Sequence, residues 1–252
     1  MKNTIKEPEN ELKYTINEGA PQKHIMLWQL LTILRDNGFN LCPIDIEEKT
    51  ISDDYYDTSN MDLLKSGGSL RTRRIQMGDT KKVKGTYKKP VESESIYSAR
   101  EEFEEPLKRD SFNYLRKAMN ETDADIDFDM IVDTPILNVT TERSEVLLEK
   151  RGALISLALD ESVYTNYKLN SPPVYDGMLE IEAKGDPRIL NEVHTIFFPT
   201  SPSFRPYKGY HKITPTKQSK YSRGINMTME FSPSFLPEES YTDKEIQFGK
   251  VY

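Results

Sequence analysis

The sequence predicts an α+β fold, a closed antiparallel β-barrel with helices packed on its outside. Two observations favour it. Strand-like segments, separated by turn residues and prolines, dominate residues 46–106 and 136–184. In several of these segments charged residues occupy alternate positions, which places them on one face of a strand. Closure removes the sheet edges, and about eight strands leave an interior wide enough for a ligand. We therefore expect a charged lumen.

Hydrophobic spacing and turn signals place the individual elements. Apolar residues recur at helical spacing from Met26 to Leu34, Gly38 is a suitable C-terminal cap, and Trp28 is expected in the core. Further helices are predicted at residues 111–119 and 187–197. Strands are predicted at residues 5–14, 49–56, 69–76, 81–89, 98–105, 136–143, 144–150, 153–164 and 177–184.

The end of the chain has a different composition. Residues 198–215 carry four prolines among aromatic side chains, which predicts an irregular loop. We expect one barrel domain over residues 1–225 and a C-terminal tail of unknown role over residues 226–252.

Composition narrows the function classes. The chain has 252 residues and a formal net charge of -7, which argues against general attraction to nucleic acid or to an anionic membrane. Its single cysteine, Cys42, excludes an internal disulfide and a cysteine-rich zinc site. The polar N-terminus lacks a signal-peptide core, and the longest apolar run, residues 25–34, is too short to span a bilayer. A cytoplasmic protein is expected.

Carboxylates recur in pairs beside a basic residue. Glu9-x-Glu11-x-Lys13 opens the chain, and Glu180-x-Glu182-x-Lys184 repeats its spacing late in the sequence. Arg100, Glu102 and Glu104 form a third such set. One charged strand is usually a solvated face, but repetition indicates charges that converge. Oxygen-only carboxylate sites suit Mg²⁺ or Mn²⁺, which also bind substrate phosphates.

Basic residues share strand faces in the same way. Arg71 and Arg73 point together, and two guanidinium forks on one face can hold phosphate oxygens. Lys84, Thr86 and Lys88 form another set, with a lysine-rich exposed edge as the alternative interpretation. A metal together with a polyphosphate is the ligand that would use both signs of charge.

Other chemistries have weaker support in the sequence. Cys42 precedes a proline in an apolar context, and the three histidines, His24, His194 and His211, have no spacing typical of a triad or a metal pair. Gly67-Gly68 lacks the lysine and serine of a phosphate-binding loop. Hydrolysis by this chain would therefore depend on metals and cations.

Taken in order, these short motifs resemble the CYTH domain, the triphosphate tunnel metalloenzymes. The resemblance covers roughly residues 5–225. It rests on Glu9-x-Glu11-x-Lys13, Tyr56-Asp57-Thr58, Leu63-Leu64-Lys65-x-Gly67, Leu70-Arg71-x-Arg73, Thr86-x-Lys88, Arg100-x-Glu102-x-Glu104, Leu159-Asp160, Glu180-x-Glu182 and Ser219-Lys220-Tyr221. The set is specific in combination, although each motif alone is short.

The resemblance implies an eight-stranded antiparallel tunnel that binds a triphosphate with a divalent metal. Its implied metal ligands are Glu9, Glu11 and Glu182, with Glu102, Glu104, Asp160 and Glu180 as further candidates. Its implied phosphate-binding residues are Lys13, Arg71, Arg73, Lys88, Arg100, Arg143 and Lys220. Thr141 stands where many members carry a basic residue, which removes one cation from this cradle.

The expected activity is metal-dependent hydrolysis of a triphosphate, with inorganic tripolyphosphate as the favoured substrate. Glu182 is a candidate to activate water, and Lys13 or Lys220 to assist the leaving group. The alternatives are a class IV-type adenylate cyclase, a thiamine triphosphatase and a non-catalytic polyphosphate-binding module. The expected partner is a small-molecule triphosphate, with neither nucleic acid nor membrane, and the choice between monomer and homodimer stays open.

Overall fold

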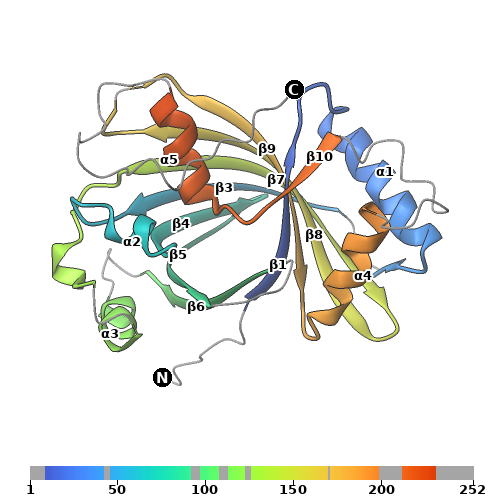
Figure 1. Cartoon of the computed structure of the whole chain (residues 1–252), viewed down its shortest axis with the longest axis horizontal. Helices are drawn as coiled ribbons and strands as arrows, with labels where there is room; N and C mark the ends of the chain where they lie inside the picture. The colour runs from blue at the N-terminus through green and yellow to red at the C-terminus, as the bar shows by residue number, and fades with distance from the viewer. Residues whose placement is uncertain are drawn as a thin grey trace.

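Antiparallel strand pairs close the backbone into a barrel (Figure 1). The computed structural model describes residues 9–42, 46–91, 97–107, 113–122, 126–169, 171–198 and 212–230. Within them the barrel strands are β1 (Glu9–Ile16), β3 (Glu47–Tyr56), β4 (Ser69–Met77), β5 (Thr80–Val91), β6 (Ser98–Pro106), β7 (Leu137–Lys150), β8 (Ala153–Asn166) and β9 (Val174–Ala183). These eight run in the order β1-β6-β5-β4-β3-β7-β8-β9, and β9 pairs back onto β1. The predicted eight-stranded antiparallel barrel is confirmed.

Two short strands extend the sheet beyond the ring. β2 (Asn40–Leu41) pairs with β7. β10 (Ile213–Thr216) pairs with the second half of β1, whose first half pairs with β6 on the same edge. The predicted irregular loop over residues 198–215 is therefore wrong at its end, where the chain adds a strand. Residues 199–211 of that loop lie outside the described residues.

Alternation along each strand separates a polar inside from an apolar outside. On β1, Leu12 and Tyr14 are buried in the hydrophobic core, whereas Glu11 and Lys13 point to the opposite face. The same period sets Leu157 outward on β8. The charged face is thus the interior of the barrel.

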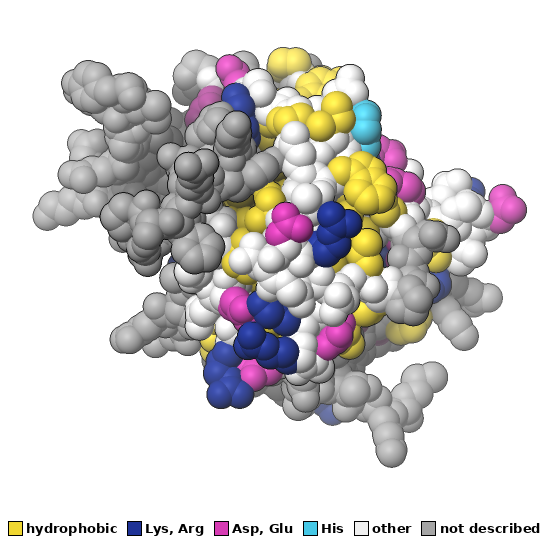
Figure 2. Space-filling view, turned by 90° about the vertical axis from the view of Figure 1, so that its right-hand side faces the viewer, with side chains coloured by type: hydrophobic (Ala, Val, Ile, Leu, Met, Phe, Trp, Pro, Cys, Tyr) yellow, Lys and Arg dark blue, Asp and Glu magenta, His cyan; other side chains and the backbone are white. Residues whose placement is uncertain are grey.

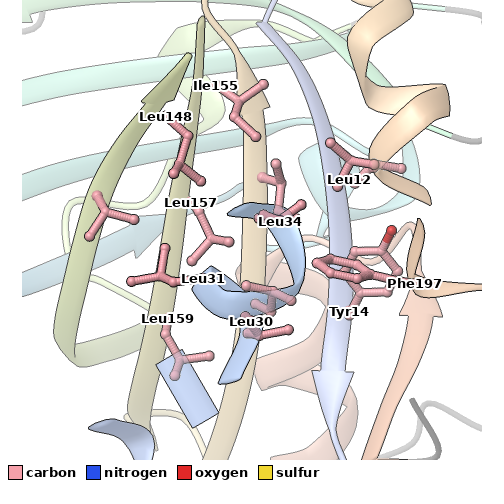
Figure 3. Close-up of a cluster of buried hydrophobic side chains, with 14 of the residues drawn as sticks. Leu12, Tyr14, Leu30, Leu31, Leu34, Leu148, Ile155, Leu157, Leu159 and Phe197 are labelled. Carbon is pink, nitrogen blue, oxygen red and sulfur yellow. The ribbon is translucent and has the colours of Figure 1, made fainter. Parts of the chain in front are cut away.

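Two helices cover one outer side of the barrel. α1 (Lys23–Asp36) and α4 (Arg188–Phe197) pack over β1, β7, β8 and β9. Figure 3 shows leucines of α1 meeting side chains of the strands, with Phe197 against Tyr14. Their fully buried members include Leu30, Leu34, Leu157 and Leu179. Complete burial of such side chains contributes roughly 1.5–3 kcal/mol each, so this cluster anchors the strands that carry much of the lumen.

A second cluster lies outside β4, β5 and β6. It is formed with α2 (Asp62–Lys65), α3 (Asn113–Thr122) and the 3₁₀ helix η1 (Phe128–Met130). Tyr87 and Phe103 stack there with ring centroids 5.8 Å apart. None of the described helices is long and apolar enough to cross a membrane.

The last helix, α5 (Lys220–Glu230), packs against inward-facing side chains. Tyr221 and Ile225 join Tyr55, Val139 and Tyr164, which share the inner faces of β3, β7 and β8. Helix α5 therefore fills part of one end of the barrel and carries its first residue, Lys220, into the interior. It also continues past residue 225, where the sequence suggested a domain boundary; residues 231–252 lie outside the described residues.

The structure corrects two further predictions. Residues 136–143 and 144–150 were expected as separate strands, but Leu137–Lys150 is one continuous strand. Trp28 was expected in the core, yet 58% of its surface is exposed. The helical period explains the error, because the face that buries Leu27, Leu30 and Leu34 turns position 28 toward solvent.

Candidate functional site

A cavity of about 60 Å³ lies inside the barrel, and its walls are almost entirely polar. Every barrel strand except β8 supplies at least one ionisable side chain to the lining, and helix α5 adds Lys220. The lining residues are Glu9, Glu11, Lys13, Tyr55, Ser69, Arg71, Arg73, Lys88, Arg100, Arg143, Ser156, Ala158, Glu180, Glu182, Ser219 and Lys220. Charges of both signs are therefore gathered in one enclosed space.

Most of the site residues predicted from the sequence meet in this cavity. All seven proposed phosphate-binding residues line it, as do four of the proposed metal ligands, Glu9, Glu11, Glu180 and Glu182. Glu102, Glu104 and Asp160 do not line it. Glu102 lies 3.6 Å from Lys88, and Glu104 pairs with Lys84. Asp160 sits behind the wall, completely buried.

Strand register explains how the acidic residues come together. In the β1–β9 pair, Glu11 stands opposite Glu182, and Lys13 stands opposite Glu180. Across the other edge of β1, Glu9 stands opposite Arg100. Directly opposed residues on one face have Cβ atoms about 4.5–5.5 Å apart, which brings these carboxylates within reach of one ligand.

A four-charge cluster holds the α5 side of the cavity. Arg143 donates to both oxygens of Asp160, at 2.8 and 2.7 Å, and also to Glu180. Lys220 donates to the same two carboxylates, at 2.5 Å for Asp160 and 3.1 Å for Glu180. Burial alone would raise the pKa of Glu180, but Lys220 and Arg143 outweigh it and hold the pKa well below its usual range. The two carboxylates therefore orient both cations.

Asp53 performs the same task for the arginines of β4. Its oxygens accept from Arg73 Nε at 2.7 Å and Arg73 Nη2 at 2.6 Å, and Arg71 Nη1 lies at 3.4 Å. Asp53 is completely buried, and burial opposes its charge, yet Arg71 and Arg73 keep its pKa far below the usual range. Asp53 was missed in the sequence, although an acidic residue inside a predicted strand, two before an inward tyrosine, could have indicated it.

Two buried polar atoms on this wall have no hydrogen-bond partner. They are Nε of Arg71 and the hydroxyl oxygen of Thr86, which face each other across the β4–β5 pair. Buried polar groups are nearly always satisfied in folded proteins. Of the two residues, Arg71 lines the cavity, so its Nε–H is a donor open to a bound ligand or water.

The comparisons with known proteins agree with this geometry. The CYTH domain matches residues 31–198, which is well over half of the chain. The chain belongs to the CYTH domain family. No curated protein matches it.

Solved structures share the CYTH fold at low sequence identity. PH1819 from Pyrococcus horikoshii is 18% identical with a TM-score of 0.50, and the match covers 87% of this chain and 99% of PH1819. HpAC1 from Hippeastrum, a candidate adenylyl cyclase described as having a dominant triphosphatase activity, is 18% identical with a TM-score of 0.51. That match covers 92% of this chain and 100% of HpAC1. At this identity the likeness shows the fold.

CYTH enzymes are metal-dependent, and the acidic side of this CYTH cavity has suitable donors. Glu9 pairs with Lys88, Glu11 with Lys13, and Glu182 with Lys184 at 2.5 Å. In the arrangement that the structure shows, the described residues contain no group of three His, Cys, Asp or Glu side chains close enough together to hold a metal ion. Carboxylate oxygens are nevertheless the donors that hard cations prefer. The glutamates therefore suit a divalent metal by donor type, and in this structure each of the three is paired with a lysine.

The electrostatics of Glu182 point the same way. Burial raises its pKa, and the negative charge of Glu9 adds to the rise against the opposing effect of Lys184. In spite of its burial, the pKa of Glu9 itself is held well below its usual range by Lys88 and Lys13. A cation bound beside the two carboxylates would favour the charged form of Glu182.

The residue that departs from the family pattern, Thr141, and the candidate nucleophile and histidines among the described residues lie away from the acidic side of the cavity. Thr141, in place of a basic residue, is buried and shares a 2.9 Å hydrogen bond with Ser162. The position of Thr141 in the CYTH barrel is therefore uncharged. His194 lies outside the barrel, with Nδ1 at 3.1 Å from the hydroxyl of Tyr14. Neither His194 nor Cys42 lines the cavity, and His211 lies outside the described residues.

Proposed function

We propose that this CYTH protein hydrolyses a triphosphate with the help of a divalent metal, and that inorganic tripolyphosphate is its favoured substrate. The observation that carries the proposal is the cavity itself, where seven Lys and Arg side chains and four glutamates face one enclosed space. A polyanion alone would need only the basic residues. The carboxylates gain a purpose when a cation is bound beside the polyanion.

Ion pairing inside the cavity supports a substrate rich in negative charge. Arg71, Arg143 and Lys220 are each balanced by a buried carboxylate. Breaking such pairs is costly unless another anion replaces the carboxylate. Phosphate oxygens accept bidentate hydrogen bonds from arginine as carboxylates do, so a triphosphate can take over part of this pairing. The free Nε of Arg71 provides one donor without any rearrangement.

The reaction follows from positioning and charge. A water oxygen attacks the terminal phosphorus, the bond from that phosphorus to its bridging oxygen breaks, and diphosphate leaves with the electron pair. Glu182 takes the proton of the attacking water, and Lys13 and Lys220 stabilise the negative charge of the leaving diphosphate. Arg71 and Arg73 hold the phosphoryl oxygens in place. Fixed cations in a buried site stabilise such a transition state without having to reorganise.

The metal would be held by Glu9, Glu11 and Glu182, with Glu102, Glu104, Asp160 and Glu180 as weaker candidates. Of these, Asp160 and Glu180 are already engaged by Arg143 and Lys220. When bound, Mg²⁺ or Mn²⁺ would supply further positive charge against the phosphate oxygens. Lys13 and Lys88, released from Glu11 and Glu9, would then be available to the substrate.

The runner-up activities need a pocket for an organic group. An adenylate cyclase must bind a purine and a thiamine triphosphatase a thiazolium, but Tyr55 is the one aromatic side chain among the described residues of the lining. Phe197, the aromatic residue at the end of α4, is buried against Tyr14 on the outside of the barrel and is not available for such a pocket. The lack of a second aromatic side chain in the described part of the lining favours the inorganic substrate, and the dominant triphosphatase activity described for HpAC1 favours hydrolysis over cyclisation.

One assay separates the activities. The purified protein is incubated with Mg²⁺ or Mn²⁺ and, separately, with tripolyphosphate, ATP and thiamine triphosphate, and released phosphate and cyclic AMP are measured. Phosphate from tripolyphosphate alone is the expected result. Cyclic AMP from ATP would establish the cyclase instead, and binding without turnover under both metals would leave a non-catalytic module.

The metal assignment has its own variant. Glu9→Gln with Glu11→Gln should lower turnover by at least about a hundredfold while the protein stays folded, because neutral amides bind hard cations poorly. Glu101→Gln is the matched control, since its neighbours on β6, Arg100 and Glu102, have the opposite orientation. An unchanged rate in the double variant would remove these glutamates from the metal site.

A further inference from the structure

Helix α1 carries an apolar outer surface that the barrel does not use. Its inner face buries Leu27 and Leu30, yet Trp28 is 58% exposed and Ile25 is 43% exposed. Trp28 is the single tryptophan of the chain. An isolated exposed leucine is ordinary on a protein surface, but a tryptophan open to this extent beside another large apolar residue marks a contact surface.

Two adjoining hollows form what we name the α1 groove. The first is a wide, shallow surface along α1 itself, formed by His24, Ile25, Trp28, Gln29, Thr32 and Ile33. The second, about 320 Å³, runs from Trp28 and Leu27 to Ile46 and ends at two acidic residues, Glu48 and Glu161. His24 and Trp28 line both hollows, so the groove is continuous. Figure 2 looks at the side of the molecule that carries α1, where hydrophobic side chains lie open among charged ones.

The rim of the α1 groove is acidic. The side chains of Glu48 and Glu161 are 64% and 61% exposed. The ammonium of Lys23 lies 3.9 Å from Glu48 and 3.8 Å from Glu161, too far for a hydrogen bond to either carboxylate. Lys23 also lines the second hollow, and its ammonium donates a 3.3 Å hydrogen bond to the backbone carbonyl of Glu142. Two carboxylates thus share one ammonium, and the rim keeps a net negative charge that a basic group could pair with.

We propose that the α1 groove is a docking site for a basic, amphipathic segment of a partner protein. The apolar side chains of that segment would pack on Ile25 and Trp28, and its lysines or arginines would meet Glu48 and Glu161. Exposed tryptophans that become buried are typical energetic centres of interfaces, while charges on the rim steer association. A second copy of this chain would bring an equally acidic rim, and an anionic membrane would be repelled by it.

The single tryptophan provides the test. The probe is a helical 14-residue peptide without tryptophan that has leucines on one face and lysines on the other. Titrating it into the whole protein should shift the emission of Trp28 to shorter wavelength and saturate. The same peptide with glutamates in place of the lysines should bind at least about fivefold more weakly, as expected for the loss of two exposed charge pairs. An emission unchanged by both peptides, or changed equally, would overturn the proposal.

Variants distinguish the groove from unspecific attraction. Glu48→Gln with Glu161→Gln should weaken binding of the lysine peptide about fivefold, and Ile25→Lys should abolish the emission shift. Asp79→Asn with Asp133→Asn removes two exposed carboxylates elsewhere and should leave the affinity unchanged. Equal weakening by both double variants contradicts the docking site. An emission shift with phosphatidylserine vesicles but not with the lysine peptide would also contradict it. So would an emission shift that appears only when the protein dimerises at high concentration, with no peptide bound.

Discussion

The phenol of Tyr221 donates a 2.7 Å hydrogen bond to Asp57, which lies 164 positions earlier in the chain. Asp57 also accepts from the backbone amides of Thr58, Leu63 and Leu64, at 2.7, 2.9 and 3.0 Å. One carboxylate therefore fixes the start of α2 and the start of α5. Because Lys220 precedes Tyr221, this hydrogen bond also fixes the backbone from which Lys220 reaches Asp160 and Glu180 in the cavity wall.

The Tyr221→Phe variant should lose the hydrogen bond to Asp57. A hydrogen bond to a carboxylate contributes about 1.5–3 kcal/mol, so the free energy of unfolding measured with urea should fall by about that amount. The affinity for tripolyphosphate should fall as well, because Lys220 is held less firmly. Tyr175→Phe is the control, since Tyr175 is 77% exposed. Equal stability of the two variants would show that the Tyr221 hydroxyl contributes nothing.

Gly224 tests how closely α5 sits on the inner wall. A Cβ at this position would lie 2.6 Å from Tyr164 Cδ1 and 2.7 Å from Leu137 Cδ2. Helix propensity alone predicts that Gly224→Ala stabilises by about 1 kcal/mol. Overpacking predicts a loss of about 1–3 kcal/mol, and we expect it to prevail because both neighbours are buried.

The melting temperature of the Gly224→Ala protein shows whether the substitution stabilises or destabilises the fold. Asn226→Ala, at an exposed position of the same helix, should be neutral or slightly stabilising. A Gly224→Ala protein that melts higher than the wild type would mean that α5 has room to move away from the barrel wall.

Much of this architecture can be predicted from the sequence, because alternation is a local signal. Glu9, Glu11 and Lys13 occupy one strand face whatever lies elsewhere, and so do Arg71 and Arg73. The sequence also predicts that these faces converge, since a barrel has only one interior. The family resemblance rests on the same alternating residues, and the CYTH match supports it.

What the sequence does not predict depends on contacts between distant segments. Asp53 becomes the counterion of two arginines only when β3 pairs with β4, where it stands opposite Arg73. Trp28 lies on a different side of α1 from the buried leucines, whereas its large apolar side chain predicts a place in the core. The strand β10 needs a free stretch of the β1 edge, which only the barrel register reveals.

Metal and substrate should each strengthen the binding of the other. Lys13 and Lys88 hold Glu11 and Glu9 in the free protein. A triphosphate that attracts these lysines frees the carboxylates for a cation, and the bound cation in turn releases the lysines. Such coupling is reciprocal by thermodynamic necessity, and typical values correspond to about 5–150-fold in affinity.

Calorimetry measures this coupling directly. Mn²⁺ titrated into the protein without substrate should bind weakly, and a slowly hydrolysed tripolyphosphate analogue should raise its affinity by at least about fivefold. The Glu9→Gln, Glu11→Gln protein should lose the enhancement. Equal Mn²⁺ affinity with and without the analogue, after correction for metal bound by the analogue itself, would contradict the exchange of partners.

Asp53 and its neighbour Asp54 offer a comparison of buried and exposed pairing on one strand. Asp53 is buried between Arg71 and Arg73, whereas Asp54 pairs at 2.5 Å with Arg74, whose side chain is 55% exposed. Asp53→Asn leaves two largely buried guanidinium groups without their counter-charge and should cost about 3–5 kcal/mol in unfolding free energy. Asp54→Asn removes one partly exposed pair and should cost about 1 kcal/mol or less.

Tripolyphosphate should distinguish a binding wall from a purely structural ion pair. If Arg71 and Arg73 face the substrate, the added polyanion supplies the charge that Asp53→Asn removed, and its stabilisation of this variant should exceed that of the wild type. Melting temperatures with and without tripolyphosphate give both values, with Asp54→Asn as the reference. An equal ligand-induced rise in all three proteins would place the two arginines outside the substrate contacts, because a wall that binds phosphate must respond to the loss of its own carboxylate.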